Sequence, residues 1–289
     1  MARLFGLIGN RPDLGSRILA AEAEALRARG RGAPLGWGIG FYQGGEVLMR
    51  RRPIDDRAEI DLAKLAQDVR SDALIGHVRS ATIGALRTEN THPFRYRQWL
   101  FAQTGTVAQF DQVRERLVAS VPEFLRGDIR GETDAEVLFH VFLSFLHDAG
   151  RLDDQAVDAQ AVKEALRSSL AVADGMTAEV GGTPAELNLL LTNGDYLVAV
   201  HRNGEMRHRT FVGRAEADQI IGDDLQLRRK TPELGQMHFS LIASDFDDGP
   251  ASASNLAVRG GADSTRWKPV AQNAIVTLTR GQDPKIEAL

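Results

Sequence analysis

The order in which strand-like and helix-like patterns follow one another restricts the fold of this chain more than any other feature. The strand-like segments of the first part are residues 3–9, a hairpin over 37–52 that turns at Gly44-Gly45, and residues 74–78 and 99–107. Helix-like patterns occupy the middle, and strand-like patterns return in the last third. This order favours two antiparallel sheets with helices packed outside them, an α+β layered fold.

The middle of the chain predicts helices from the spacing of its apolar residues. Residues 111–119 and 154–173 have this spacing, as does the shorter stretch 61–69. The strongest helix signal begins at Thr133, because Glu136 completes a capping-box pattern. An apolar stripe at helical spacing follows and comprises Val137, Leu138, Val141, Phe142, Phe145 and Leu146. This helix is therefore expected to bury one broad face.

Strands fill the last third of the chain. The strongest turn signal is Asn193-Gly194, and Asn203-Gly204 gives a second one. The strands expected around and after these turns are residues 187–191, 197–201, 207–212, 239–243 and 274–278. No linker rich in Pro, Gly or Ser divides the chain, and a surface loop is expected over residues 249–263. We therefore expect a single domain over residues 1–289.

Charge and hydropathy narrow the function classes. The 289 residues include 35 basic and 39 acidic side chains, the formal net charge is -4, and the pI is about 6.0. This weakly acidic balance gives no electrostatic case for binding nucleic acid or an anionic membrane. No secretory signal is visible, and no stretch approaches the roughly 20 apolar residues of a membrane helix. We expect a soluble cytoplasmic protein with no nucleic acid or membrane partner.

The chain contains no cysteine. Disulfides, thiolate metal sites and thiol nucleophiles are therefore excluded within these residues. His77 and His92 are candidate metal ligands, but no carboxylate cluster accompanies them, and two histidines alone make a weak metal signal. The glycine-rich phosphate and dinucleotide motifs, the HExxH zinc motif and the EF-hand loop do not occur in the sequence. We expect neither a metal nor a cofactor.

Several segments are rich in residues that carry chemistry. Residues 36–42 contain glycines that permit close approach of the backbone, to a ligand or to a tightly packed neighbouring strand. Arg79, near the end of a strand, suits capture of a carboxylate, and the alternative is a surface arginine with a solvated partner. Strand alternation places His77 on the same face as Arg79. Asp134 lies in the first turn of a predicted helix, where it either complements the helix dipole or binds a ligand ammonium group.

Short motifs follow one another in a specific order along most of the chain. They are residues 4–6, 36–42, 77–82, 90–94, 100–102, 133–136, 193–195, 243–245 and 267–270. In order and spacing, this set resembles the class II glutamine amidotransferases, a branch of the N-terminal nucleophile hydrolases, and among them the stand-alone members. The resemblance implies a four-layer αββα sandwich, which agrees with the layered fold expected from the hydrophobic patterns.

The resemblance also implies roles for individual residues. In this family Met1 is removed, and a cysteine at the second position attacks the glutamine side-chain amide with its own α-amino group as the base. An arginine binds the substrate carboxylate and an aspartate at a helix start binds the α-ammonium group. These two residues correspond to Arg79 and Asp134, with Thr82 nearby. A His-Asn-Gly motif supplies the oxyanion hole from the Asn side chain and the Gly backbone N–H.

This sequence departs from the family pattern at the catalytic atoms. Ala2 stands at the position of the nucleophile, and a methyl group cannot attack a carbonyl carbon. The oxyanion motif reads Gln103-Thr104-Gly105, so Thr104 and Gly105 would form a degenerate oxyanion hole. Thr104 is shorter than asparagine and donates a single proton. Loss of one oxyanion donor costs about 10²–10³ in rate.

Three functions are compatible with this pattern. The first is a pseudoenzyme that binds an amino acid or γ-glutamyl ligand through Arg79, Thr82 and Asp134, or acts through a protein partner, and performs no hydrolysis. The second is an active glutamine or γ-glutamyl amide hydrolase in which an engineered change replaced cysteine by Ala2. The third is a scaffold or regulatory subunit with a vestigial pocket. An engineered change explains one replaced residue but not the altered oxyanion motif as well, so the sequence favours the first.

Overall fold

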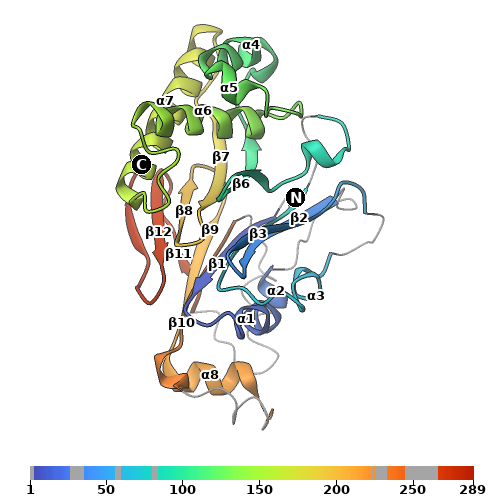
Figure 1. The fold of residues 1–289 in the computed structure, drawn as a ribbon, viewed down its shortest axis with the longest axis vertical. Helices are drawn as coiled ribbons and strands as arrows, with labels where there is room; N and C mark the ends of the chain where they lie inside the picture. Colours follow the sequence, from blue (N-terminus) through green and yellow to red (C-terminus); the bar gives the residue numbers. More distant parts are fainter. Residues whose placement is uncertain are drawn as a thin grey trace.

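The computed structural model describes residues 3–26, 36–55, 60–79, 84–222, 224, 233–244 and 266–289. Ala2 and Thr82, two of the residues singled out above, lie outside these ranges, and so does the loop expected over residues 249–263. The described helices and strands form two sheets that lie face to face, with helices on the outer face of each (Figure 1). The α+β sandwich expected from the sequence is confirmed.

The first sheet has seven antiparallel strands within the described residues. In the order in which they pair, they are β11 (Lys268–Pro269), β9 (Met206–Val212), β10 (His238–Ser244), β1 (Arg3–Gly9), β4 (Ala73–Arg79), β2 (Gly36–Gln43) and β3 (Glu46–Arg52). The hairpin expected over residues 37–52 is confirmed as β2 and β3, with Trp37 paired to Arg52. Strand β1 is central, and its two partners β4 and β10 come from distant parts of the chain. The sheet therefore ties the two ends of the chain together.

The second sheet has six antiparallel strands within the described residues. In the order in which they pair, they are β13 (Lys285–Ala288), β12 (Ala274–Thr279), β8 (Tyr196–His201), β7 (Glu186–Thr192), β6 (Trp99–Thr106) and β5 (Phe94–Tyr96). Strands β7 and β8 form the hairpin expected around Asn193-Gly194. Gly194 has a φ of +94°, and Asn193 Oδ1 accepts a hydrogen bond from the backbone N–H of Asp195 at 3.1 Å. These are the features that make Asn-Gly a strong turn signal.

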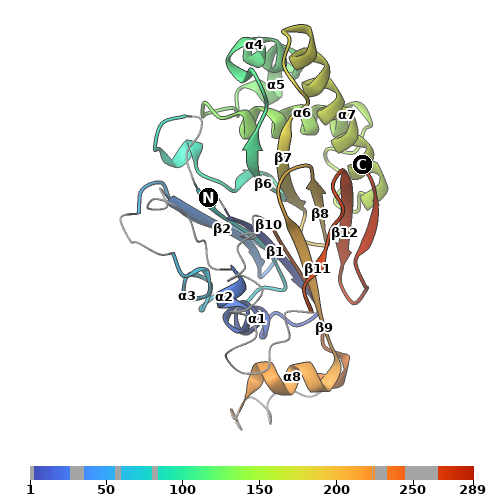
Figure 2. The same ribbon diagram turned by 180° about the vertical axis from the view of Figure 1, so that it is seen from behind.

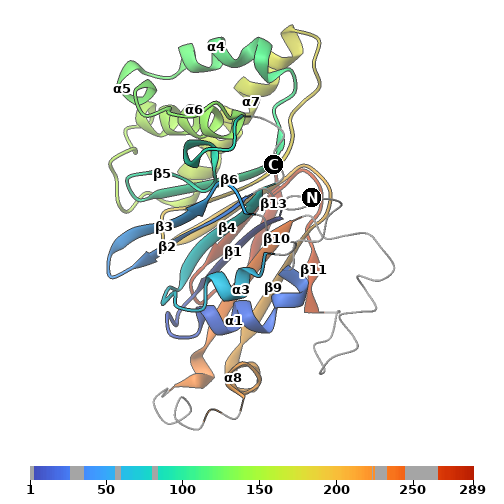
Figure 3. The ribbon, with the colours of Figure 1, turned by 90° about the vertical axis from the view of Figure 1, so that its right-hand side faces the viewer.

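Helices cover both outer faces of the sandwich. They are α1 (Gly15–Ala21), α2 (Ala23–Leu26), α3 (Leu62–Leu65), α4 (Phe110–Ser120), α5 (Glu123–Arg126), α6 (Asp134–Asp148), α7 (Ala159–Glu179) and α8 (Gly213–Ile221), with 3₁₀ turns η1 (Thr88–Asn90) and η2 (Leu234–Gln236). Figure 3 shows α4 to α7 on the six-stranded sheet and α1, α3 and α8 on the seven-stranded sheet. The C-terminus lies beside α7 (Figure 2). None of the described helices is long and apolar enough to cross a membrane.

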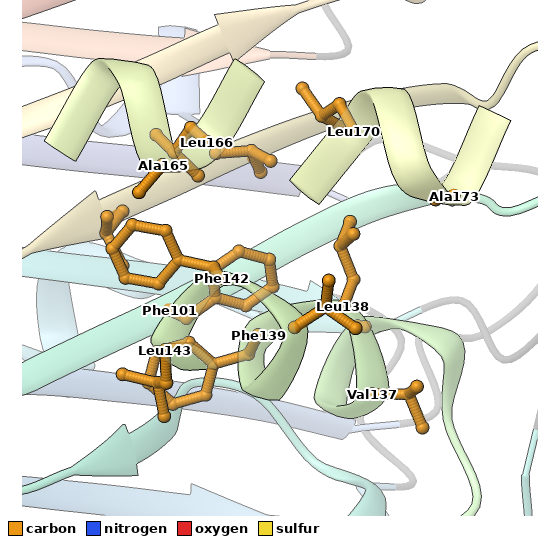
Figure 4. Close-up of a cluster of buried hydrophobic side chains, with 14 of the residues drawn as sticks. Phe101, Val137, Leu138, Phe139, Phe142, Leu143, Ala165, Leu166, Leu170 and Ala173 are labelled. Atoms are coloured by element: carbon orange, nitrogen blue, oxygen red, sulfur yellow. The ribbon is translucent and has the colours of Figure 1, made fainter. Parts of the chain in front are cut away.

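The apolar core is divided among the three interfaces between the four layers. The largest cluster joins the six-stranded sheet to α4, α6 and α7, and Figure 4 shows Phe139 and Phe142 of α6 beside Phe101 of β6 and Leu166 of α7. The rings of Phe101 and Phe139 stack at 5.2 Å. These side chains are among the fully buried ones, and each contributes roughly 1.5–3 kcal/mol by its burial. The apolar stripe expected on α6 is thus confirmed as the contact between helix and sheet.

The other two clusters lie on either side of the seven-stranded sheet. Phe5 and Leu7 of β1 pack with α1, α3 and α8, whereas Leu4 and Ile8 point into the gap between the sheets. Both faces of β1 are buried, so its sequence is a nearly continuous apolar run in which polar and apolar residues do not alternate. The sequence segment 3–9 therefore indicated a strand but not which of its side chains face the second sheet.

The glycines of residues 36–42 allow the sheets to approach each other closely. A Cβ atom on Gly38 would lie 1.9 Å from the carbonyl oxygen of His92, and one on Gly40 would lie 2.9 Å from Leu100 Cδ1. Gly6 on β1 has a similar neighbour, because its Cβ would lie 2.4 Å from Leu197 Cδ1. Of the two interpretations of these glycines, the described contacts support close packing against a neighbouring strand.

Two helices differ from their expected bounds. The helix expected over residues 154–173 is α7 and runs from Ala159 to Glu179, because Asp158 caps it by accepting the backbone N–H of Ala161 at 2.9 Å. It continues past Gly175 because the residues of its last turn still pack on the helix–sheet cluster. The helix expected over residues 61–69 is shorter, at Leu62–Leu65.

Candidate functional site

Arg79 ends strand β4 and is 4% exposed. It lies on the face of β4 that carries Ala73 and Ile75, which pack between the two sheets, because alternate residues of a strand share a face. Its guanidinium group donates hydrogen bonds to the carbonyl oxygens of Gly84 at 3.0 Å and Ala85 at 3.2 Å. Burial lowers the pKa of Arg79. The arginine is therefore held inside the sandwich and is not a solvated surface residue.

The acceptors of Arg79 are tied to the segment that leads into helix α6. The backbone N–H of Ala85 donates to Glu132 at 3.2 Å, and Arg87 forms an ion pair with the same carboxylate at 2.9 Å. Asn90 donates to the carbonyl oxygen of Ala85 at 3.0 Å and accepts from the backbone N–H of Glu132 at 2.8 Å. These bonds fix the end of β4 against the residues just before α6.

Asp134 is the first residue of α6 and is 5% exposed. Thr133 caps the helix by accepting the backbone N–H of Glu136 at 3.2 Å, which confirms half of the capping box. The Glu136 carboxylate does not complete the box, since it accepts the backbone N–H groups of Arg130 at 3.0 Å and Gly131 at 2.6 Å. The cap holds Asp134 at a fixed place at the helix start, where the dipole favours an acidic group.

The carboxylate of Asp134 reaches from the helix to strand β6. Its Oδ2 atom accepts the backbone N–H of Val107 at 2.8 Å and the side-chain amide of Gln103 at 3.2 Å. Burial raises the pKa of Asp134 to about 6, although these hydrogen bonds act in the opposite direction. Asp134 is therefore a buried carboxyl with a raised pKa, as ligand-binding carboxyls often are.

The three residues of the expected oxyanion motif lie in consecutive positions on β6, next to β7. Gln103 shares a face with Phe101, toward the helices, and Thr104 shares a face with Ala102, toward the gap between the sheets. Thr104 is 5% exposed. Thr104 and Arg79 thus point into the same gap between β4 and β6, the strands that face each other in the sandwich (Figure 3).

Gly105 has a structural requirement of its own. Its φ is +83°, and a Cβ atom would lie 2.1 Å from the carbonyl oxygen of Glu186 on β7. Any other residue would be strained at this position, whatever the chemistry of the site. The presence of Gly105 in the motif therefore does not by itself indicate a working oxyanion hole.

His77 and His92 form a buried pair beside Arg79. Their ring centroids lie 4.3 Å apart, and the ring of His92 also contacts Phe94 edge-on at 4.7 Å. Burial lowers the pKa of His77 to about 3 and that of His92 well below its usual value, so both rings are neutral. Among the described residues, no group of three or more His, Asp or Glu side chains could hold a metal ion. The pair packs where the end of β4 meets the residues just before β5, against Phe94.

Of the predicted site residues, Arg79 lies at the end of β4, Thr104 and Gly105 lie on β6, which contacts β4, and Asp134 is joined to β6 and the residue after it through Gln103 and Val107. Ala2 and Thr82, the other two predicted site residues, lie outside the described residues. From the sequence, Gln103 is only the residue that replaces the histidine of the family's oxyanion motif. Its hydrogen bond to Asp134 joins residues that are far apart in sequence, so no local pattern could have predicted it.

Comparison with known proteins decides the family. The family model described as glutamine amidotransferases class-II matches residues 1–255. The chain belongs to the class II glutamine amidotransferase family. This confirms the family expected from the ordered motifs, and the matched region contains every residue of the site described above.

Relatives and solved structures agree with this family. The chain is 27% identical to the probable glutamine amidotransferase DUG3 of Saccharomyces cerevisiae over 230 residues, which are 74% of this chain and 57% of that protein. It is 25% identical to a glutamine–fructose-6-phosphate aminotransferase of Streptococcus pyogenes, over 82% of this chain and 34% of that enzyme. The chain thus spans less than two thirds of the length of both relatives.

Solved structures support the fold of this class II amidotransferase family member. A glutamine aminotransferase class-II domain protein from Silicibacter pomeroyi superposes with a TM-score of 0.59 at 16% identity and covers 99% of both chains. The glutamine phosphoribosylpyrophosphate amidotransferase of Bacillus subtilis superposes with a TM-score of 0.54 at 16% identity, over 99% of this chain and 49% of that one. Both similarities concern the arrangement of layers and strands.

Proposed function

We propose that this protein binds an α-amino acid or a γ-glutamyl compound at the position of the family's glutamine site and does not hydrolyse it. The observation that carries this proposal is the burial of two opposite charges, Arg79 at 4% and Asp134 at 5% exposure, in a chain without cysteine. Arg79 is held in place by the carbonyl oxygens of Gly84 and Ala85, and burial raises the pKa of the Asp134 carboxyl, so a ligand ammonium group would stabilise the ionised carboxylate. The thiol of the family reaction is absent, whereas the charged groups for an amino acid remain.

The groups at the site match the two charged ends of an amino acid. Arg79 offers a planar guanidinium for the carboxylate. Asp134 offers a carboxylate for the ammonium group, and Gln103 adds a second acceptor, because its Oε1 atom has no hydrogen-bond partner among the described residues. An ammonium group brings three donors. A ligand ammonium would therefore satisfy both the charge of Asp134 and the unpaired amide oxygen.

Two features argue against hydrolysis. The chain has no thiol, and Ala2 stands where the resemblance places the nucleophile. The oxyanion donor that the family takes from an asparagine side chain is replaced by Thr104, which is shorter and donates one proton. Loss of one oxyanion donor alone lowers the catalytic rate by about 10²–10³. With the nucleophile absent as well, we predict no measurable glutaminase activity.

Isothermal titration calorimetry with L-glutamate, L-glutamine and γ-glutamylglycine tests the proposal. We expect saturable binding of at least one of them, which Asp134→Asn weakens about tenfold or more because a charge-assisted bond to the ammonium group is lost. The affinity should rise as the pH increases through about 6, since Asp134 binds the ammonium group in its ionised form and its pKa is raised to about 6.

Asp158→Asn is the matched control for the calorimetry. Asp158 also lies at the start of a long helix and accepts a backbone N–H, but at α7, away from the site. The Asp158→Asn variant should bind the three compounds with unchanged affinity. Absence of binding at millimolar concentrations of all three compounds would favour a scaffold with a vestigial pocket instead.

The alternative of an active hydrolase whose cysteine was replaced has a direct test. Ala2→Cys would restore the thiol, and ammonia release from L-glutamine would then be measured. We expect no turnover, because Gln103 and Thr104 still replace the family's oxyanion residues. Turnover in Ala2→Cys that is lost again in the double variant Ala2→Cys/Arg79→Gln would support the active enzyme.

A further inference from the structure

The six-stranded sheet ends in an open edge at β13. Among the residues that the structure describes, this strand pairs only with β12, and the two strands lie at the side of the molecule (Figure 2). The residues of β13, which are Lys285, Ile286, Glu287 and Ala288, are all exposed, and the large apolar side chain of Ile286 is 44% exposed. An edge strand of this kind offers backbone N–H and C=O groups with which another strand can pair.

Ile286 directs its backbone groups away from the molecule. Successive residues of an antiparallel strand turn their N–H and C=O groups to opposite sides. The N–H of Leu289 donates to the carbonyl oxygen of Asn273 at 2.8 Å, which continues the pairing of β13 with β12. Every second residue back from Leu289 therefore bonds to β12, and the backbone groups of Ile286 and Ala288 point outward.

The side chains of β13 alternate between the two faces of the sheet. Ile286 pairs with Val276 of β12 and therefore lies on the face toward the gap between the sheets, as Val276 does. Lys285 and Glu287 lie on the other face, beside helix α7, where Glu287 forms an ion pair with Lys163. The strand thus carries a basic and an acidic residue on one face, with an apolar residue between them on the other.

We propose that two copies of this protein associate by antiparallel pairing of β13 with β13 of the second copy. A two-fold axis at Ile286 places this residue opposite itself, so that the two copies exchange two N–H···O hydrogen bonds there and the two apolar side chains meet. Lys285 of each copy then lies opposite Glu287 of the other. Opposite charges at directly facing positions stabilise a strand pair.

The ends of β13 fit the same register. Pro284, just before the strand, lies opposite Ala288 of the second copy and has no N–H to donate. The carbonyl oxygen of Ala288 does not need that N–H, because it already accepts a hydrogen bond from Arg167 of α7 at 2.9 Å. The N–H of Ala288 is left to donate to the carbonyl oxygen of Pro284. The register therefore gives every outward-pointing backbone group of these residues a partner.

The neighbouring symmetric registers bring like charges together. A two-fold axis at Lys285 would place the two lysines opposite each other, and an axis at Glu287 would do the same with the two glutamates. Like charges directly opposite each other destabilise a strand pair. The charges of β13 therefore favour the register centred on Ile286.

Sedimentation velocity of the full chain over a range of concentrations tests the dimer. Stable interfaces bury about 1,200–2,000 Å² in total, and a single short strand edge provides less, so monomer and dimer should be in equilibrium. We expect the sedimentation coefficient to rise from the monomer value toward the dimer value between about 10 µM and about 1 mM protein.

Ile286→Pro tests the backbone pairing. Proline removes the outward N–H of residue 286 but no hydrogen bond to β12, and an edge strand tolerates proline at such a position. Because the two-fold axis doubles the loss, dimerisation should weaken about tenfold or more. Ile286→Val is the matched control, since it keeps the N–H and an apolar side chain and should dimerise as the wild type does. Thermal melting checks that both variants are folded.

Lys285→Glu and Glu287→Lys test the register. Each variant alone places like charges opposite each other and should dimerise more weakly than the wild type. An equimolar mixture of the two variants restores both pairs of opposite charges, so a mixed dimer should form. Glu115→Lys, a charge reversal on helix α4, is the control and should leave dimerisation unchanged. A wild type that stays monomeric at about 1 mM, Ile286→Pro that dimerises like the wild type, or a mixture no more associated than its two components would overturn the proposal.

Discussion

At the scale of single residues, Asp134 is the group whose environment says most about the protein. Its carboxyl is buried between the start of α6 and strand β6, and its hydrogen bonds come from backbone N–H groups and a neutral side-chain amide. No described contact gives it a cationic partner of the kind that lowers a pKa, and burial raises the pKa to about 6. The folded protein therefore holds the proton of this side chain to a higher pH than an exposed aspartate does, and the carboxyl is ionised above about pH 6.

Asp134→Asn should change how stability depends on pH. Because the pKa of Asp134 is raised from 3.8 to about 6, its contribution to the free energy of unfolding is fully present below about pH 3.8 and is lost as the pH rises through 6. The loss amounts to roughly 3 kcal/mol. Urea unfolding of both proteins at about pH 4 and pH 8 should show the wild type losing this much relative to the variant. A stability difference that is the same at both pH values would refute the raised pKa.

Gly105→Ala should destabilise the protein by more than a positive φ alone explains. Its Cβ would clash with the Glu186 carbonyl oxygen, and the φ of +83° adds strain. The expected cost is about 2–3 kcal/mol, measured by chemical denaturation. Gly150→Ala is the control, because Gly150 has a φ of +67° and open space around it. Equal costs for the two variants would mean that the clash is relieved by movement of β7.

At the scale of elements, the start of α6 links helix stability to the site. Thr133 caps the helix and Asp134 follows it. Thr133→Ala should cost about 1 kcal/mol and should also weaken amino acid binding, because the position of Asp134 depends on the cap. Asp158→Ala removes the corresponding cap of α7 and should cost a similar amount without affecting binding. Thermal unfolding measures the loss of stability and calorimetry measures the affinity for the amino acid in both variants. If Thr133→Ala and Asp158→Ala bind the ligand equally well, the cap of α6 does not position Asp134 for binding.

The sequence predicted elements well where a buried face or a turn motif defined them. The hairpins at Gly44-Gly45 and Asn193-Gly194 and the apolar stripe of α6 were all found where expected. Strand β13 (Lys285–Ala288) was missed because all of its residues are exposed, so it has no apolar alternation. Helix α1 (Gly15–Ala21) was missed because it is short and lacks a side-chain cap. Elements held mainly by pairing with a neighbour carry little local signal.

In the candidate site, too, residues with a local sequence signal could be predicted, whereas contacts between distant segments could not. The positions of Arg79 and Asp134 followed from recognisable motifs at the end of a strand and at the start of a helix, and their roles in ligand binding stay predictions. The contacts that orient them were not, since the acceptors of Arg79 are loop carbonyls and the donor to Asp134 is Gln103 on another layer. Such contacts depend on how β4, β6 and α6 come together in the sandwich, which residue order alone does not encode.

At the scale of the whole molecule, a buried ionic network joins distant parts of the chain. Glu22 forms an ion pair with Arg209 on β9, and its other oxygen accepts the indole N–H of Trp267 at 2.8 Å. Glu22 and Arg209 are each 4% exposed. The partners lie 187 and 245 residues from Glu22 in sequence. The network therefore fastens the end of helix α1 to strand β9 and to Trp267, which immediately precedes β11.

Glu22→Ala should destabilise the whole fold by about 3–5 kcal/mol, because it leaves the Arg209 charge buried without its main partner. Glu179→Ala is the control, since it breaks an ion pair with Arg116 in which the two side chains are 63% and 46% exposed. Removal of such a surface pair should cost no more than about 1 kcal/mol. Guanidinium chloride unfolding measures both, and similar losses in the two variants would contradict a structural role for the buried network.

We propose that this class II amidotransferase family member binds an amino acid ligand without hydrolysing it. Isothermal titration calorimetry with L-glutamine tests both parts at once, because binding gives heat that returns to the baseline after each injection, whereas hydrolysis gives continuing heat flow. We predict a saturable binding signal that returns to the baseline and that Asp134→Asn weakens. Continuing heat flow would contradict the absence of hydrolysis, and no heat at millimolar glutamine would contradict ligand binding.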